Sequence, residues 1–150
     1  MSNTTLKLLA KDLTKDYPRS PRALLGGYVL AGRMLDKCRA ALAGTAGEYH
    51  FNCPLDNFFL SFSGVKADEF KEFVATGATD DEIAAWIGKK AAKREKIEII
   101  KWNNEWREKR LSQCPDDTQE YMEEYVPKFI PRNRVAHVFF DIFDIEEQRI

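Results

Sequence analysis

Residues 54–64, PLDNFFLSFSG, decide how the rest of the chain is interpreted. An α-helix brings residues three and four positions apart onto one face. Four apolar residues of this stretch follow that spacing and would form a single stripe: Leu55, Phe58, Phe59 and Phe62. Pro54 suits a first helical turn, and Gly64 is typical of the residue that follows a helix. The stretch therefore predicts a helix over residues 54–63.

The same periodicity recurs on both sides and predicts about six helical stretches separated by glycine and proline. The others run from after Gly27 to about 43, from 66 to Gly77, from Thr79 through Ile87, from 95 to 111, and from after Pro115 to near Pro127. Ser20 followed by Pro21 predicts a helix start, with Ser20 as the cap and Pro21 in the first turn. Thr79 and Glu82 match the capping-box pattern. Residues 134–145 fit a helix or a strand, and this choice stays open.

These patterns predict an all-α fold, an irregular orthogonal bundle of five to seven helices in one domain. Its core is expected at six positions: Phe58, Phe62, Phe70, Phe73, Trp86 and Ile100. In the helix that ends near residue 43, the apolar spacing of Ala31, Leu35, Cys38 and Leu42 places Arg33, Asp36 and Lys37 on the opposite face.

The composition is that of an ordinary globular domain. The chain has 150 residues, of which 44% are hydrophobic and 31% charged, and its net charge is -1. Folding therefore needs no metal, cofactor or disulfide. The three cysteines, Cys38, Cys53 and Cys114, form no Cys-x-x-Cys pair, which favours a reducing, cytoplasmic setting. No signal peptide or membrane-spanning run is recognisable.

The predicted helix over residues 95–111 has apolar residues on two opposite faces. Trp102 and Trp106 share one of them. Such a helix is either packed on both sides or offers one face to a partner, for example a second copy of the chain. Packing is favoured because tryptophan is more often a core residue. The helix is rich in Lys and Arg, but interleaved Glu residues suit local ion pairs, so nucleic-acid binding is not expected.

The segment from Tyr49 to Asp56 combines several chemically active residues. Cys53 would stand at a helix start, where the helix dipole favours a thiolate, and His50 could act as its base. Asp56 would oppose the thiolate by its charge. The alternative is structural: Cys53 or Asn52 caps the helix and Asp56 offsets the dipole. This reading is favoured because residues 114–117 repeat the Cys-Pro-x-Asp arrangement.

A zinc site is not expected. His50, Cys53, Cys114 and His137 include suitable ligand types, but only His50 and Cys53 are spaced as paired zinc ligands are.

A second polar cluster surrounds the predicted helix start at Pro21. Arg19 and Arg22 flank it, and free backbone N–H groups at a helix start attract anions. The cluster is completed by Asp12, Asp36 and Arg39, and a neighbouring pocket is expected to be lined by Tyr49, His50 and Cys53. Alternatively, and more simply, the arginines pair with Asp12, Asp16 or Asp36 and fix the N-terminal segment.

The chain resembles a bacterial family known as domain of unknown function 5069. The resemblance is carried by short strings spread over nearly the whole chain: 12–14, 18–21, 26–28, 36–40, 47–49, 53–56, 75–77 with Asp80, 85–86 and 144–147. It implies a soluble, stand-alone domain and no particular activity, cofactor or catalytic residue.

The leading functional hypothesis is a small cytoplasmic binding module that accepts an anionic ligand or a protein segment at the arginine cluster. The alternatives are an enzyme with Cys53 as nucleophile or redox thiol and His50 as base, and an oligomerising structural protein that uses Trp102 and Trp106.

Overall fold

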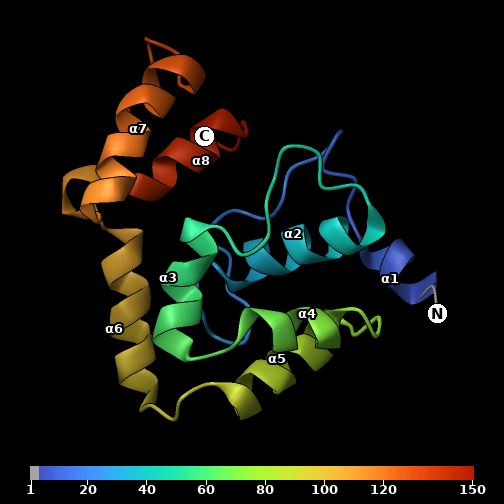
Figure 1. Ribbon diagram of the computed structural model, residues 1–150. Helices are drawn as coiled ribbons and strands as arrows, with labels where there is room; N and C mark the ends of the chain where they lie inside the picture. Colours follow the sequence, from blue (N-terminus) through green and yellow to red (C-terminus); the bar gives the residue numbers. More distant parts are fainter. Residues whose placement is uncertain (1–3) are drawn as a thin grey trace. The chain divides into compact units, whose positions relative to one another are not determined.

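The computed structural model describes residues 4–150, which form eight α-helices, one 3₁₀ turn and no strand (Figure 1). The helices are α1 (Thr4–Leu9), α2 (Ala31–Ala43), α3 (Pro54–Ser63), α4 (Ala67–Val74), α5 (Asp80–Lys90), α6 (Lys96–Arg107), α7 (Asp116–Phe129) and α8 (Phe139–Glu146), with the turn η1 at Leu111–Gln113. The all-α prediction is confirmed, and the short α1 takes the number of helices above the expected range.

Contacts group the chain into two compact units, one ending at Ile99 and the other beginning at Ile100. Each unit is described by itself below. The prediction of one domain over residues 1–150 stays a prediction. No helix of the described chain is both long and apolar enough to cross a membrane.

Helices with a clear local start and stop follow their predicted bounds. α3 begins at Pro54 and ends before Gly64, whose φ of 76° is a left-handed conformation that suits glycine. The capping box of α5 is present: Glu82 N–H donates to Thr79 Oγ1 at 3.3 Å, and Thr79 N–H donates to Glu82 Oε1 at 2.9 Å. These signals need only neighbouring residues, which is why the sequence reveals them.

The predicted helix start at Ser20–Pro21 is wrong. Residues 21–30 form turns instead, and Leu25 and Tyr28 exchange backbone hydrogen bonds at 3.1 Å across a tight reversal. The helix α2 begins only at Ala31, because Leu30 has a left-handed φ of 71° that interrupts any helix before it.

The ends of the last two helices also differ from the sequence prediction. α7 continues through Pro127 to Phe129. The open choice for residues 134–145 is resolved as a helix, α8, which begins at Phe139 rather than near Arg134. Asp141 caps it, since its Oδ2 accepts the N–H groups of His137 at 2.9 Å and Val138 at 3.1 Å.

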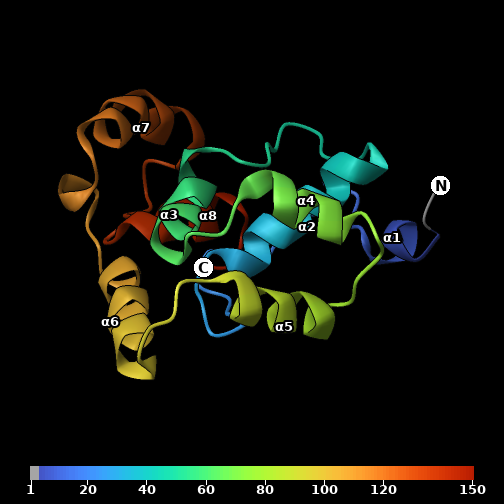
Figure 2. The same cartoon turned by 60° about the horizontal axis from the view of Figure 1, so that its bottom comes forward.

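In the first unit, α4 and α5 lie side by side (Figures 1 and 2). Trp86 of α5 packs against Phe70 and, in a stacked arrangement with ring centroids 5.5 Å apart, against Phe73. The most deeply buried side chains of this unit include Phe59, Phe70, Ile83 and Ile87. Of the predicted core residues, Phe70 is fully buried, and Phe58, Phe62, Phe73 and Trp86 are partly buried.

Two expectations about burial are wrong. Ile100 is 38% exposed and is not a core residue. In α2, Arg33, Asp36 and Lys37 do not form a solvent-facing side, because every residue from Ala31 to Ala40 is buried. The irregular segments before and after α2 cover its charged side, and they are joined to each other where Leu13 N–H donates to the Thr45 carbonyl at 2.8 Å. α2 also packs on α1, α3 and α4.

The second unit has an aromatic core. Trp106 of α6 packs against Phe139 and, nearly parallel at 6.4 Å, against Phe140 of α8. Trp102 and Trp106 are only 9% and 6% exposed, so their face of α6 is packed. On the opposite face Ile97 and Ile100 are 54% and 38% exposed, so the prediction that this helix is packed on both sides is wrong. Association of two chains through these tryptophans stays a prediction.

Candidate functional site

A buried carboxylate on α2, Asp36, organises the arginine cluster in the first unit. It accepts hydrogen bonds from the backbone N–H of Arg19 at 2.8 Å and from Arg19 Nη2 at 2.9 Å, and Arg19 Nε lies 3.1–3.2 Å from both carboxylate oxygens. Lys11 Nζ lies 3.8 Å from the same carboxylate. The Arg19 side chain runs over Gly32, where a Cβ would come within 3.4 Å of Arg19 Cδ and Nε. Asp36 and Gly32 thus fix the direction of the Arg19 guanidinium.

The first residue of α5, Asp80, connects this arginine to a second one. Its Oδ2 accepts from Arg19 Nη1 at 2.9 Å, and its Oδ1 accepts from Arg39 Nη1 at 2.8 Å. Arg39 also donates from Nη2 to the Ala78 carbonyl at 2.9 Å. A single carboxylate therefore sits between two guanidinium groups that other contacts hold in place.

The two ends of this cluster differ in their exposure to water. The side chains of Asp36 and Arg39 are 5% and 4% exposed, whereas that of Asp80 is 46% exposed. The network joins three cations, Lys11, Arg19 and Arg39, to two carboxylates. It therefore carries one positive charge in excess, and its Asp80 end is open to solvent.

The charges of the cluster reinforce one another. Burial alone would lower the pKa of Arg19, but the hydrogen bonds and charges of Asp36 and Asp80 raise it above its usual value. Burial alone would raise the pKa of Asp80, but its hydrogen bonds and charge interactions with Arg39 and Arg19 lower it below the usual value. Both groups are therefore ionised at neutral pH.

A second cluster lies around Lys37, the next residue of α2. Lys37 Nζ lies 2.8 Å from Asp56 Oδ1 and 3.1 Å from Cys53 Sγ. Asp56 Oδ2 accepts the backbone N–H of Asn52 at 2.9 Å. The Lys37 and Asp56 side chains are 4% and 2% exposed, so this ion pair is closed to water. Cys53 stands at the N-cap position of α3, where its side chain makes no capping hydrogen bond, and it is half-buried.

The structure brings together half of the residues predicted to bind an anion: Arg19, Asp36 and Arg39. The simpler alternative is also realised for one of them, because Arg19 pairs with Asp36. Asp12 instead closes its own turn, accepting the N–H of Thr14 at 3.0 Å, and the Thr14 contacts lower its pKa. Arg22 donates its backbone N–H to Ser20 Oγ at 3.1 Å.

The remaining predicted residues belong to the segment from Tyr49 to Asp56. The guanidinium carbon of Arg33 lies over the Tyr49 ring, 5.6 Å from the ring centroid. His50 is exposed, and among the described residues the contact made by the Cys53 thiol is with Lys37 rather than with His50. A catalytic role of Cys53, with His50 and Asp56, stays a prediction.

Sequence reasoning missed Lys37 and Asp80 as members of these clusters. Lys37 was placed on a solvent-facing side because its burial depends on distant segments. Asp80 contributed only to the family resemblance, and no local spacing connects it with Arg19 or Arg39, which are 61 and 41 residues away.

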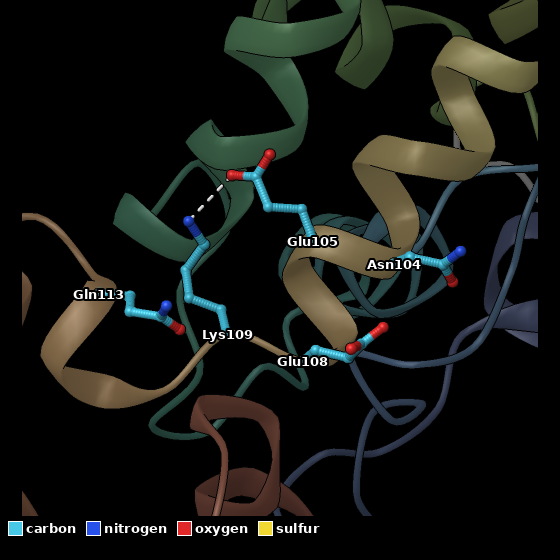
Figure 3. A pocket seen from close by; sticks show the side chains of 5 residues that line it. All are labelled: Asn104, Glu105, Glu108, Lys109 and Gln113. Carbon is cyan, nitrogen blue, oxygen red and sulfur yellow. Dashed lines mark hydrogen bonds and ion pairs between the residues drawn. The ribbon is translucent and has the colours of Figure 1, made fainter.

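The second unit contains a shallow polar pocket of about 460 Å³ (Figure 3). It is lined by Asn104, Glu105, Glu108, Lys109 and Gln113. Lys109 Nζ lies 3.0 Å from Glu105 Oε2 and also over the Trp106 ring. The Lys109 ammonium is therefore already paired within the protein. Neither cluster of the first unit lines this pocket. Within residues 4–150, no three His, Cys, Asp or Glu side chains are grouped so that they could hold a metal ion.

Comparison with known proteins places the chain in a family. None of the curated proteins compared with it matches. The profile of one family, described as a domain of unknown function (DUF5069), matches residues 15–149, which contain the Lys37 cluster and all of the arginine cluster except Lys11. The chain therefore belongs to the DUF5069 family.

Proposed function

We propose that this protein is a small cytoplasmic binding module that holds an anionic group between Arg19 and Arg39. The position now filled by the Asp80 carboxylate is the binding position. The ligand is a small carboxylate or phosphate, or an acidic residue of a protein segment, because each offers two oxygens to two guanidinium groups.

The bridging contact of Asp80 is the observation that carries this proposal. Two guanidinium groups donate to one carboxylate, at 2.9 and 2.8 Å. Each guanidinium group also donates a second hydrogen bond that fixes its position, Arg19 to Asp36 and Arg39 to the Ala78 carbonyl. Donors that are fixed before binding lose little conformational entropy when a ligand arrives. Asp80 thus occupies a site suited to a carboxylate from outside.

Exchange of Asp80 for a ligand is supported by exposure and charge. Its side chain is nearly half exposed and can turn into water when an outside anion replaces it, so the cost of the exchange is small. The excess positive charge of the cluster favours an additional anion. One further donor, Arg39 Nε, is buried and has no hydrogen-bond partner among the described residues.

The cytoplasmic setting belongs to the same proposal. It is supported by Cys38, Cys53 and Cys114, which are all free thiols, as is usual in a reducing compartment.

Isothermal titration with inorganic phosphate and with acetate tests the proposal. Replacing Asp80 by Asn removes the internal competitor, and we expect phosphate affinity to rise about tenfold, the equivalent of about 1.4 kcal/mol. Asp81→Asn is the matched control, because Asp81 stands on the same turn of α5, is exposed and is outside the cluster. Equal affinities of the two variants, or no binding by either, would contradict the proposal.

A further inference from the structure

We propose that Cys53 and Lys37 form a modification site for hydroperoxides, at which oxidation of the thiol joins the two side chains by a sulfur–nitrogen bond. This site is separate from the anion position between Arg19 and Arg39, and its test is independent of it. The proposal rests on the contact of Lys37 Nζ with Cys53 Sγ at 3.1 Å and on the position of Asp56 behind that amine.

Cys53 is the cysteine that a peroxide can reach. It is half-buried at the start of α3, whereas Cys38 and Cys114 are buried. Burial raises the pKa of the Cys38 thiol to about 12 and that of Cys114 to about 11, so both stay protonated and unreactive. Cys53 instead lies beside an ammonium group, which favours the negative charge that develops on the leaving oxygen when a peroxide is attacked.

The first step is a two-electron oxidation. The Cys53 sulfur attacks one oxygen of hydrogen peroxide, the O–O bond breaks, and the products are a sulfenic acid and water. Sulfur is oxidised and peroxide is reduced. The new S–OH group is then beside Lys37 Nζ.

The second step is a condensation without further oxidant. The Lys37 ammonium gives one proton to the Asp56 carboxylate, 2.8 Å away, and becomes a nucleophilic amine. Its nitrogen attacks the sulfur, the S–O bond breaks, and the hydroxyl group leaves with a second nitrogen-bound proton as water. The buried ion pair becomes a neutral sulfenamide and a neutral carboxylic acid, so no unpaired charge remains inside the protein.

The residue after Cys53 directs the reaction to Lys37. A sulfenic acid can condense with a backbone nitrogen. Here the following residue is Pro54, which has no backbone N–H, so this neighbour cannot react. The Lys37 amine, 3.1 Å from the thiol on the buried part of α2, is the nitrogen that takes its place.

The new bond would connect α2 to the start of α3 and close a loop that contains the irregular segment before α3. Closing a loop restricts the unfolded chain, so the oxidised protein should melt at a higher temperature than the reduced one. Proteolysis within residues 44–52 should also become slower.

Mass spectrometry of the full chain after treatment with hydrogen peroxide tests the proposal. The expected product is lighter than the reduced protein by two hydrogen atoms, and dithiothreitol restores the original mass. Trypsin should no longer cleave after Lys37, and the peptide that contains Lys37 should be joined to the one that contains Cys53. Cys53→Ser should abolish the product, and Cys114→Ser should leave it unchanged.

A double variant, Lys37→Met with Asp56→Asn, keeps the interior uncharged and separates the two steps. It should stop at the sulfenic acid, one oxygen heavier, which a dimedone probe traps. Should it not fold, the peptide map of the wild type still decides the question. A wild-type product that remains a sulfenic acid, a disulfide with Cys38 or Cys114, or an unreacted Cys53 would each overturn the proposal.

Discussion

Two consecutive residues of α2, Asp36 and Lys37, are buried with charged partners, but their clusters differ in one respect. Lys37 and Asp56 form a pair that is shielded from water at both ends. Asp36 begins a network that passes through Arg19 to Asp80, whose side chain is 46% exposed. A pair closed to water has no end that a ligand from solution can replace, whereas a network with an exposed end can exchange that end for a ligand. Their different responses to substitution test this distinction.

The largest effect is expected in the closed pair. Asp56→Ala leaves the Lys37 ammonium buried without its counter-ion and should lower the free energy of unfolding by about 3 to 5 kcal/mol. Urea denaturation measures this. In the double variant Asp56→Ala with Lys37→Met the charge is removed as well, and most of the loss should be recovered. A single variant as stable as the wild type would show that water reaches the pair.

A somewhat smaller loss is expected at the buried end of the open network. Asp36→Asn removes the charge that accepts from the backbone and the guanidinium of Arg19. We expect about 2 to 3 kcal/mol less stability, the range of one or two hydrogen bonds to a charged group. Urea denaturation again provides the measurement, with Asp16→Asn as an exposed control in the same unit. Equal stability of both variants would contradict the role of Asp36.

At the exposed end the effect on stability should be smaller still. Asp80→Asn weakens two ion pairs that water and salt already screen, and we expect a loss of about 0.5 to 1 kcal/mol. The same variant is expected to bind phosphate more tightly, so stability and binding should change in opposite directions. A loss as large as that of Asp36→Asn would mean that Asp80 is a structural residue like Asp36.

The smallest expected effect is on how the stability of the protein depends on pH. Arg39 and Arg19 lower the pKa of Asp80 in the folded protein. Its contribution to stability is therefore complete above the pKa of an unfolded aspartate, about 3.9, and is lost as the pH falls through the folded value. Between about pH 5 and pH 3, stability should decline less steeply in Asp80→Asn than in the wild type. Thermal melts at a series of pH values measure both slopes, and parallel curves would contradict the assignment.

The helices that the sequence predicts well are those whose ends are decided by neighbouring residues. Pro54 and Gly64 mark α3, and Thr79 with Glu82 marks the start of α5. The start of α2 was misplaced because the turn at Leu25–Tyr28 and the left-handed Leu30 have no strong local signal. α8 stayed ambiguous because its aromatic and β-branched residues suit strands as well as helices.

The candidate site was predictable only in part. The arginine pattern indicated Arg19, Arg39 and Asp36, which do lie together. The pairing of each charge was beyond the sequence, because it depends on chain segments far apart. The charged side of α2 has the periodicity of a solvent-facing side, and residues distant in sequence make it an interior: Arg19 pairs with Asp36, and Cys53 and Asp56 contact Lys37.

The most direct test of the difference between the two clusters is NMR of the arginine and lysine side chains during a phosphate titration of the Asp80→Asn variant. We predict that the guanidinium signals of Arg19 and Arg39 shift together and saturate, while the Lys37 ammonium signal does not move. Shifts spread over exposed lysines without saturation, or equal shifts at Lys37, would contradict an open network beside a closed pair.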